Sequence, residues 1–213
     1  MDVEKNNHGF TLIELIIAML ICVIVMAGII SAFRKQETSH LTQEQVIEMQ
    51  QSLRGALNIM AKDIRMAGYD PDGTHGSGIV IAGDGSNNAN TMKFTYFNKD
   101  AGTDNADNDN DGTKDESGEE LQTIEYYIYD SLSDGNNDIG RRYGARLDAI
   151  VKNIATLKFT YLDKSGIVTA DISAIRSIKV LIKTQPDINA ANFAGGGTRT
   201  LTETIKCRNL GLK

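Results

Sequence analysis

Tryptophan is absent from the sequence, and tyrosine and phenylalanine together supply only 6% of its 213 residues. Any hydrophobic core must therefore be built mainly from aliphatic side chains. Runs of Lys and Arg are also lacking, and the formal net charge is −6. Because a nucleic-acid-binding protein needs clustered Lys and Arg to neutralise phosphates, we expect no nucleic-acid partner.

Cysteine and histidine are equally scarce. Cys22 lies inside an apolar run and Cys207 lies near the end of the chain. A disulfide needs Cα atoms within about 7 Å, so we expect no bond between two such distant environments. The histidines are His8, His40 and His75, and none has a ligand partner at the spacing of a zinc site. We interpret both cysteines as structural.

The most prominent feature present is an apolar run from Phe10 to Phe33. A helix of this length spans about 36 Å, enough to cross a hydrocarbon layer of about 30 Å. Glu14 interrupts the run, and a carboxylate facing lipid costs about 2.5–3.5 kcal/mol, so it needs a partner. An ordinary membrane anchor leaves Glu14 unexplained. An ordinary signal peptide would show a small-residue cleavage site after the run, and none follows Phe33.

The run is preceded by Gly9 and begins with Phe10-Thr11-Leu12-Ile13-Glu14. This hexapeptide, followed directly by an apolar helix, resembles the class III signal of type IV prepilins and pseudopilins. The resemblance implies that residues 1–9 are a leader peptide. It implies that a prepilin peptidase cuts between Gly9 and Phe10 and then methylates the Phe10 amine. Glu14 would pair with the positive N-terminal amine of another subunit, and Leu12–Ile30 would form the core of a filament.

The same resemblance implies a location and a set of partners. The precursor would be a single-pass protein of the bacterial inner membrane with a periplasmic body, embedded in lipid before assembly. The mature chain would then enter an extracellular pilus or a periplasmic pseudopilus, together with other major and minor pilin subunits and an inner-membrane assembly platform. Many major pilins carry a proline in the apolar half of the helix, whereas the first proline here is Pro71.

Beyond Phe33 the sequence becomes polar but keeps a helical period. Apolar residues recur every three or four positions at Val46, Met49, Leu53, Leu57, Met60, Ile64 and Ala67. Gly68 and Pro71 then supply stop signals. One helix is therefore expected from about Phe10 to about Ala67, with residues 10–33 in the membrane and residues 34–68 amphipathic. We place Lys62, Asp63 and Arg65 on its solvated face.

The residues at the end of this helix make the family resemblance more specific. The residues Met60-Ala61-Lys62-Asp63-Ile64-Arg65-Met66-Ala67-Gly68-Tyr69 resemble the helix end of PilW-like minor pilins and of J-type pseudopilins of type II secretion. Taken with the N-terminal signal, this favours a minor pilin that helps to prime filament assembly near the tip. A J-type minor pseudopilin is the first alternative, and a calcium-dependent tip adhesin is the second.

Residues 69–213 are predicted to form a β-rich body. Runs of β-branched and aromatic residues, separated by Gly, Asn, Asp and Ser, predict strands at Ile79–Ala82, Thr91–Phe97, Leu121–Tyr129, Ile150–Tyr161, Ile175–Thr184 and Thr200–Cys207. Ala190–Gly197 is expected to be a loop. An antiparallel sheet packed on the apolar stripe of the long helix gives an α+β fold. No motif of catalytic residues is found: Gly76-Ser77-Gly78 follows His75, where a nucleophile elbow needs another Gly, so we do not expect an enzyme.

One acidic stretch, residues 103–120, suggests a metal. Asp107, Asp109 and Asp111 stand at alternate positions before Gly112, which matches the first half of an EF-hand-type loop. Thr113 would add its backbone carbonyl, Asp115 a water-mediated ligand and Glu119 a carboxylate, although Gly118 occupies the place of the usual bidentate glutamate. The pattern predicts a Ca²⁺ site with altered loop geometry. The alternative is a solvated acidic loop without metal.

Overall fold

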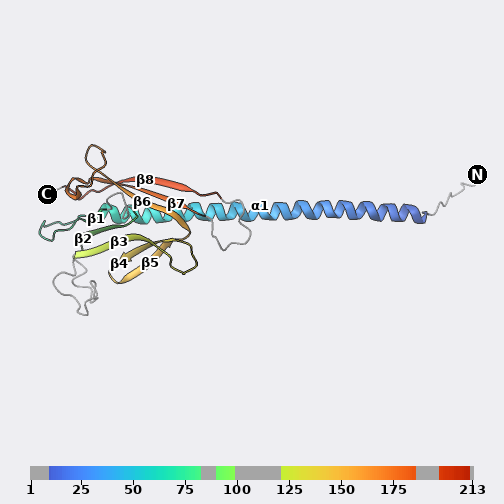
Figure 1. Cartoon of the computed structure of the whole chain (residues 1–213), viewed down its shortest axis with the longest axis horizontal. Helices are drawn as coiled ribbons and strands as arrows, with labels where there is room; N and C mark the ends of the chain where they lie inside the picture. The colour runs from blue at the N-terminus through green and yellow to red at the C-terminus, as the bar shows by residue number, and fades with distance from the viewer. Residues whose placement is uncertain (1–9, 83–89, 99–120, 186–196, 212–213) are drawn as a thin grey trace, which may run out of the picture. The chain divides into compact units, whose positions relative to one another are not determined.

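The computed structural model describes residues 10–82, 90–98, 121–185 and 197–211. The first element of the described residues is one long helix, α1 (Leu12–Met66). In the described residues it is followed by β1 (Ile79–Ala82), β2 (Met92–Phe97), β3 (Leu121–Tyr129), β4 (Asp138–Tyr143), β5 (Arg146–Val151), β6 (Ile154–Leu162), the 3₁₀ helix η2 (Ile172–Ala174), β7 (Ser177–Thr184) and β8 (Thr200–Lys206). Figure 1 shows these elements along the chain.

The chain divides into two compact units, residues 1–45 and residues 46–213, so that α1 passes through both. In the first unit the described residues 10–45 are almost wholly helical, and every side chain from Phe10 to Leu41 is exposed. An 18-residue window of this helix has a mean hydropathy of 3.0, and α1 is long and apolar enough to cross a membrane.

The second unit is built on the remainder of α1. The predicted stripe is confirmed here: Leu53, Leu57, Met60, Ile64 and Ala67 are buried, while Val46 and Met49 at its start are half-buried. Their apolar side chains cover the inner faces of the strands, which is the interaction that holds the helix and sheets together. The sheet residues of this core are Ile79, Met92, Phe94, Ile124, Tyr126, Ile139, Val151, Ile154, Leu157, Phe159, Tyr161, Ile178, Val180, Ile182 and Ile205.

The strands form two antiparallel sheets where we expected one. Sheet A follows the order β1-β2-β3-β4-β5, and sheet B follows the order β6-β7-β8. In both sheets each strand pairs with the next strand of the chain. In Figure 1, β3, β4 and β5 lie on one side of the C-terminal part of α1 and sheet B lies on the other. The α+β fold is confirmed, with a layered core made by helix and sheets.

The prediction of a single strand over Ile150–Tyr161 is wrong. β5 ends at Val151 and β6 begins at Ile154, and Asn153 between them has a φ of 58°. Asparagine tolerates this left-handed conformation better than most residues, so it can turn the chain from one sheet to the other. β4 was not predicted, and only the end of β5 was, because their Asp and Arg residues hide the usual β pattern.

The expectation that Asp63 lies on a solvated face is wrong. Lys62 and Arg65 are exposed, but Asp63 is only 8% exposed. Its Oδ2 accepts hydrogen bonds from the Tyr126 hydroxyl at 2.5 Å and from Arg141 Nε at 2.6 Å. Burial and the Asp63 charge raise the pKa of the Tyr126 hydroxyl. Burial opposes the charge of Arg141, but the hydrogen bond and charge of Asp63 outweigh it and raise the pKa of Arg141.

Candidate functional site

The first described residues, Phe10 to Glu14, form a helix start with a specific hydrogen-bond pattern. Thr11 stands just before α1, and its carbonyl accepts the first helical bond from the Leu15 amide. The Glu14 amide donates to Thr11 Oγ1 at 3.4 Å. In return, Glu14 Oε2 accepts from the Thr11 amide and from the Thr11 hydroxyl, each at 2.9 Å. This is a capping box, in which the residue before the helix and the third helical residue satisfy each other's backbone donors.

The capping box explains part of what the sequence left open about Glu14. The expected partner of its carboxylate was an amine of another subunit, whereas in the isolated chain Thr11 supplies two donors. The spacing Thr-x-x-Glu before an apolar run is a recognised signal for a capping box and would have identified Thr11. Thr11 is therefore a site residue that was missed.

The position of Phe10 fits a role at a new chain end. Its side chain is 93% exposed, and its backbone nitrogen is one peptide bond away from the capped Thr11 amide. A cut before Phe10 would therefore create an amine on the residue directly before the capping box. Gly9, the residue expected before that cut, lies outside the described residues.

The apolar surface behind this cap has no cover within its own unit. Leu12 is 78% exposed and Phe33 is 69% exposed, and the residues between them include many Leu, Ile and Val side chains. Soluble monomers rarely expose contiguous apolar patches of more than a few hundred Å². This surface therefore requires lipid or the helices of other proteins around it.

The predicted calcium ligands Asp107, Asp109, Asp111, Thr113, Asp115 and Glu119 all lie outside the described residues. The structure therefore does not test them. Among the residues that it does describe, no group of three or more His, Cys, Asp or Glu side chains could hold a metal ion. Cys22 is exposed and Cys207 is buried, and both thiols are free.

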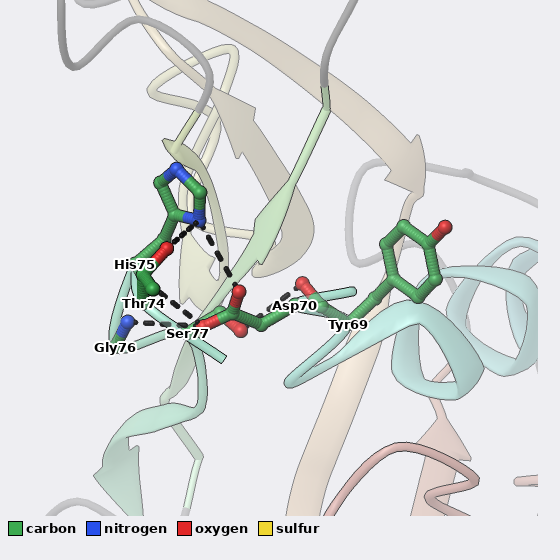
Figure 2. Close-up of polar contacts among 6 residues, drawn as sticks. All are labelled: Tyr69, Asp70, Thr74, His75, Gly76 and Ser77. Atoms are coloured by element: carbon green, nitrogen blue, oxygen red, sulfur yellow. Dashed lines mark hydrogen bonds and ion pairs between the residues drawn. The ribbon is translucent and has the colours of Figure 1, made fainter. Parts of the chain in front are cut away.

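The segment after α1 brings together an aspartate, a histidine and a serine (Figure 2). The side chain of Asp70 is 1% exposed, and its Oδ2 accepts from the amides of His75 and Gly76 at 3.0 and 3.1 Å. Its Oδ1 lies 3.2 Å from His75 Nδ1. A serine nucleophile would need its hydroxyl bonded to the imidazole, but Ser77 Oγ donates to the Tyr69 carbonyl at 3.0 Å. These contacts make a folded turn at the end of the helix.

Comparison with known proteins concerns the start of the chain. Residues 5–30 match the prokaryotic N-terminal methylation motif. A search of curated proteins finds no match. The matched motif supports a type IV pilin-like class III signal, and with it processing by a prepilin peptidase and assembly with other pilins. Together with the apolar helix it fits a membrane-anchored precursor, and the motif is characteristic of structural subunits.

Proposed function

We propose that this protein is a minor pilin of a type IV pilus, similar to PilW-like subunits, which helps to prime filament assembly at or near the tip. The observation that carries the proposal is Glu14 at the head of an uncovered apolar helix, inside the matched methylation motif. Cleavage between Gly9 and Phe10 releases the leader, and methylation then modifies the new Phe10 amine. The body lies in the periplasm until the subunit leaves the membrane.

Charge pairing gives Glu14 its proposed role. Among packed apolar helices an unpaired carboxylate or amine is costly, and each can offset the other's burial. The positive amine of one subunit and Glu14 of its neighbour therefore attract each other only at one axial offset. In the free subunit, the Thr11 amide and hydroxyl hold the carboxylate at the helix start. The capping box thus keeps Glu14 oriented beside the chain end before assembly.

A pair of Glu14 variants tests whether the charge or the cap matters. Glutamine serves in a capping box as glutamate does, so Glu14→Gln keeps the cap and removes the charge. Glu14→Ala removes both. We expect both variants to be cleaved and to remain in the membrane, and both to be lost from sheared filaments. Normal incorporation of Glu14→Gln would show that Glu14 acts only as a helix cap and would contradict the pairing.

Deletion of the gene in its native host tests the choice of machine. A minor pilin predicts loss of surface filaments, counted by electron microscopy, with protein secretion unchanged. A J-type pseudopilin, which the same helix-end residues resemble, predicts the reverse. Restoration of filaments by the wild-type gene is the control for effects on neighbouring genes.

A further inference from the structure

Sheet B carries a positive outer face, which we call the lysine face and define as Lys158, Lys179, Lys183 and Lys206. On β7 the alternate residues Ile178, Val180 and Ile182 are buried, so Lys179 and Lys183 point away from the core. Lys158 on β6 and Lys206 on β8 lie on the same side, and both are exposed. The fold thus gathers four cations that are scattered through the last 56 residues of the sequence.

The strand register places Lys206, Lys179 and Lys158 in one diagonal row, and Lys183 is the next diagonal neighbour of Lys158. Lys158 pairs with Leu181, which puts it diagonally next to both Lys179 and Lys183. Lys206 pairs with Ser177 and is the diagonal neighbour of Lys179. Diagonal neighbours in a sheet are about 7–8 Å apart, which is within the Debye length of about 8 Å at physiological salt. The electrostatic potentials of the four lysines therefore add.

No carboxylate neutralises this row within the described strands. The only acidic residue of β6, β7 and β8 is Glu203, which pairs with Val180 and so belongs to the opposite face. The other outward positions hold threonine, serine, leucine and alanine. In the described part of the chain, none of the four lysines forms an ion pair.

The sequence contains a segment of opposite charge. Residues 103–120 include eight Asp and Glu residues and one Lys, a net charge of −7. Because the whole chain carries −6, the rest of it sums to +1. The acidity of the protein is therefore concentrated in this one segment, which we call the acidic segment.

We propose that the lysine face binds the acidic segment of a second copy of this chain. Charge complementarity between the two supports the pairing. The segment connects β2 to β3, where Phe97 pairs with Leu121 in sheet A. The lysine face belongs to sheet B, which pairs with no strand of sheet A and lies on the other side of α1 from β3 in Figure 1. A neighbouring copy can present its acidic segment to this face directly.

The composition of the face favours carboxylates over other anions. Bidentate recognition of phosphate is typical of Arg, and stacking on single-stranded bases needs aromatic side chains. The outward positions of β6, β7 and β8 have neither. Lysine is a flexible point charge, which suits carboxylates spaced along a peptide. The inference is independent of the proposed pilus function, because two purified chains suffice to test it.

The first experiment measures binding of a fluorescent peptide with the sequence of residues 103–120 to the full-length protein in mild detergent. We expect saturable binding that weakens as salt rises from about 50 to about 500 mM. A peptide with all eight acidic residues changed to Asn or Gln should not bind. The variant K158E/K179E/K183E should bind the acidic peptide at least about tenfold more weakly. The matched variant K152E/K164E, with exposed lysines outside the face, should bind it normally.

A peptide of reversed charge tests whether the triple variant is still folded and able to bind. A peptide with the eight acidic residues changed to Lys should bind K158E/K179E/K183E and not the wild type. Mixing two variants then tests whether the acidic segment binds the lysine face of a second copy. One variant has a neutralised acidic segment, and the other is K158E/K179E/K183E. Neither should form crosslinked dimers alone, but the two should crosslink to one another when combined.

Three outcomes would overturn the proposal. The first is equal affinity of the triple variant and the wild type for the acidic peptide. The second is absence of crosslinks in the mixture. The third is binding of phosphatidylglycerol vesicles or single-stranded DNA by the lysine face with no binding of the peptide, which would assign the face to a membrane or nucleic acid.

Discussion

Replacement of Asp63 by Asn tests whether the buried polar cluster stabilises the second unit. Asp63 Oδ2 accepts both the Tyr126 hydroxyl and Arg141 Nε, so one oxygen connects α1 to β3 and β4. Tyr126 is fully buried, and the Arg141 side chain is 22% exposed. Asparagine has the same shape but no charge, so the substitution leaves a partly buried guanidinium without its counter-ion.

The magnitude follows from these burials. Removing one partner of a fully buried ion pair costs about 3–5 kcal/mol. Water can reach part of Arg141, so we expect a smaller loss of about 2–3 kcal/mol for Asp63→Asn. Tyr126→Phe removes one hydrogen bond to a charged acceptor and should cost about 1.5–2 kcal/mol. Because both bonds end on the same oxygen, the double variant should differ from the sum by at least about 0.5 kcal/mol.

Urea unfolding of the full-length protein in mild detergent measures these changes. All seven tyrosines lie at or beyond Tyr69, so the tyrosine band of the near-ultraviolet circular dichroism spectrum reports on the second unit. Lys62→Gln is the matched control, because Lys62 is next to Asp63 in the sequence but has an exposed side chain. Its free energy of unfolding should stay within about 0.5 kcal/mol of the wild type. A loss below about 0.5 kcal/mol for Asp63→Asn would refute the reasoning, because the carboxylate would then be no better than a solvated one.

The remaining predictions concern two glycines, one cysteine and the acidic segment. Gly68→Ala should destabilise by about 1–3 kcal/mol in the same urea assay, because its φ is 74° and a Cβ would lie 2.4 Å from Leu210. Gly55→Ala, inside α1 with open space around it, should stabilise by about 0.5–1 kcal/mol, and equal effects would contradict this explanation. Burial raises the pKa of the Cys207 thiol to about 12. The unfolded thiol ionises first, so stability should fall by about 1.4 kcal/mol per pH unit from pH 9 toward pH 12 through this group. Cys207→Ala should flatten that slope in urea titrations, and an unchanged slope would refute the assignment. Calorimetry should detect Ca²⁺ binding that EGTA reverses and that Asp109→Asn weakens. Absence of heat when Ca²⁺ is added to the wild type would contradict a calcium site in the acidic segment.

The sequence predicted the long helix and its buried stripe because both follow from periodicity and length alone. The sequence also predicted the end of the helix, because Gly68 is a stop signal there. In the structure Gly68 adopts a φ of 74°, a conformation that favours glycine. Six strand positions could be read from β-branched runs, but β4 and most of β5 could not, since their Arg and Asp residues resemble a loop. The chain passes from sheet A to sheet B through Asn153, whose left-handed φ of 58° no periodicity reveals.

The sites show the same limit. The hexapeptide at the start of the helix identified Gly9, Phe10 and Glu14 as candidates, because that signal is contiguous in sequence. The contacts of Asp63 with Arg141 join residues 78 positions apart, and only tertiary packing brings them together. The lysine face likewise arises from strand register. Contiguous signals could be predicted, whereas sites assembled by the fold could not.

Intact mass spectrometry of the protein from membranes of its native host, with and without the prepilin peptidase, tests the central claim most directly. We predict a mature chain that begins at a methylated Phe10 and appears only when the peptidase is present. An uncleaved chain, or one cut beyond Phe33, would contradict the account and leave an anchored or secreted domain without a filament role.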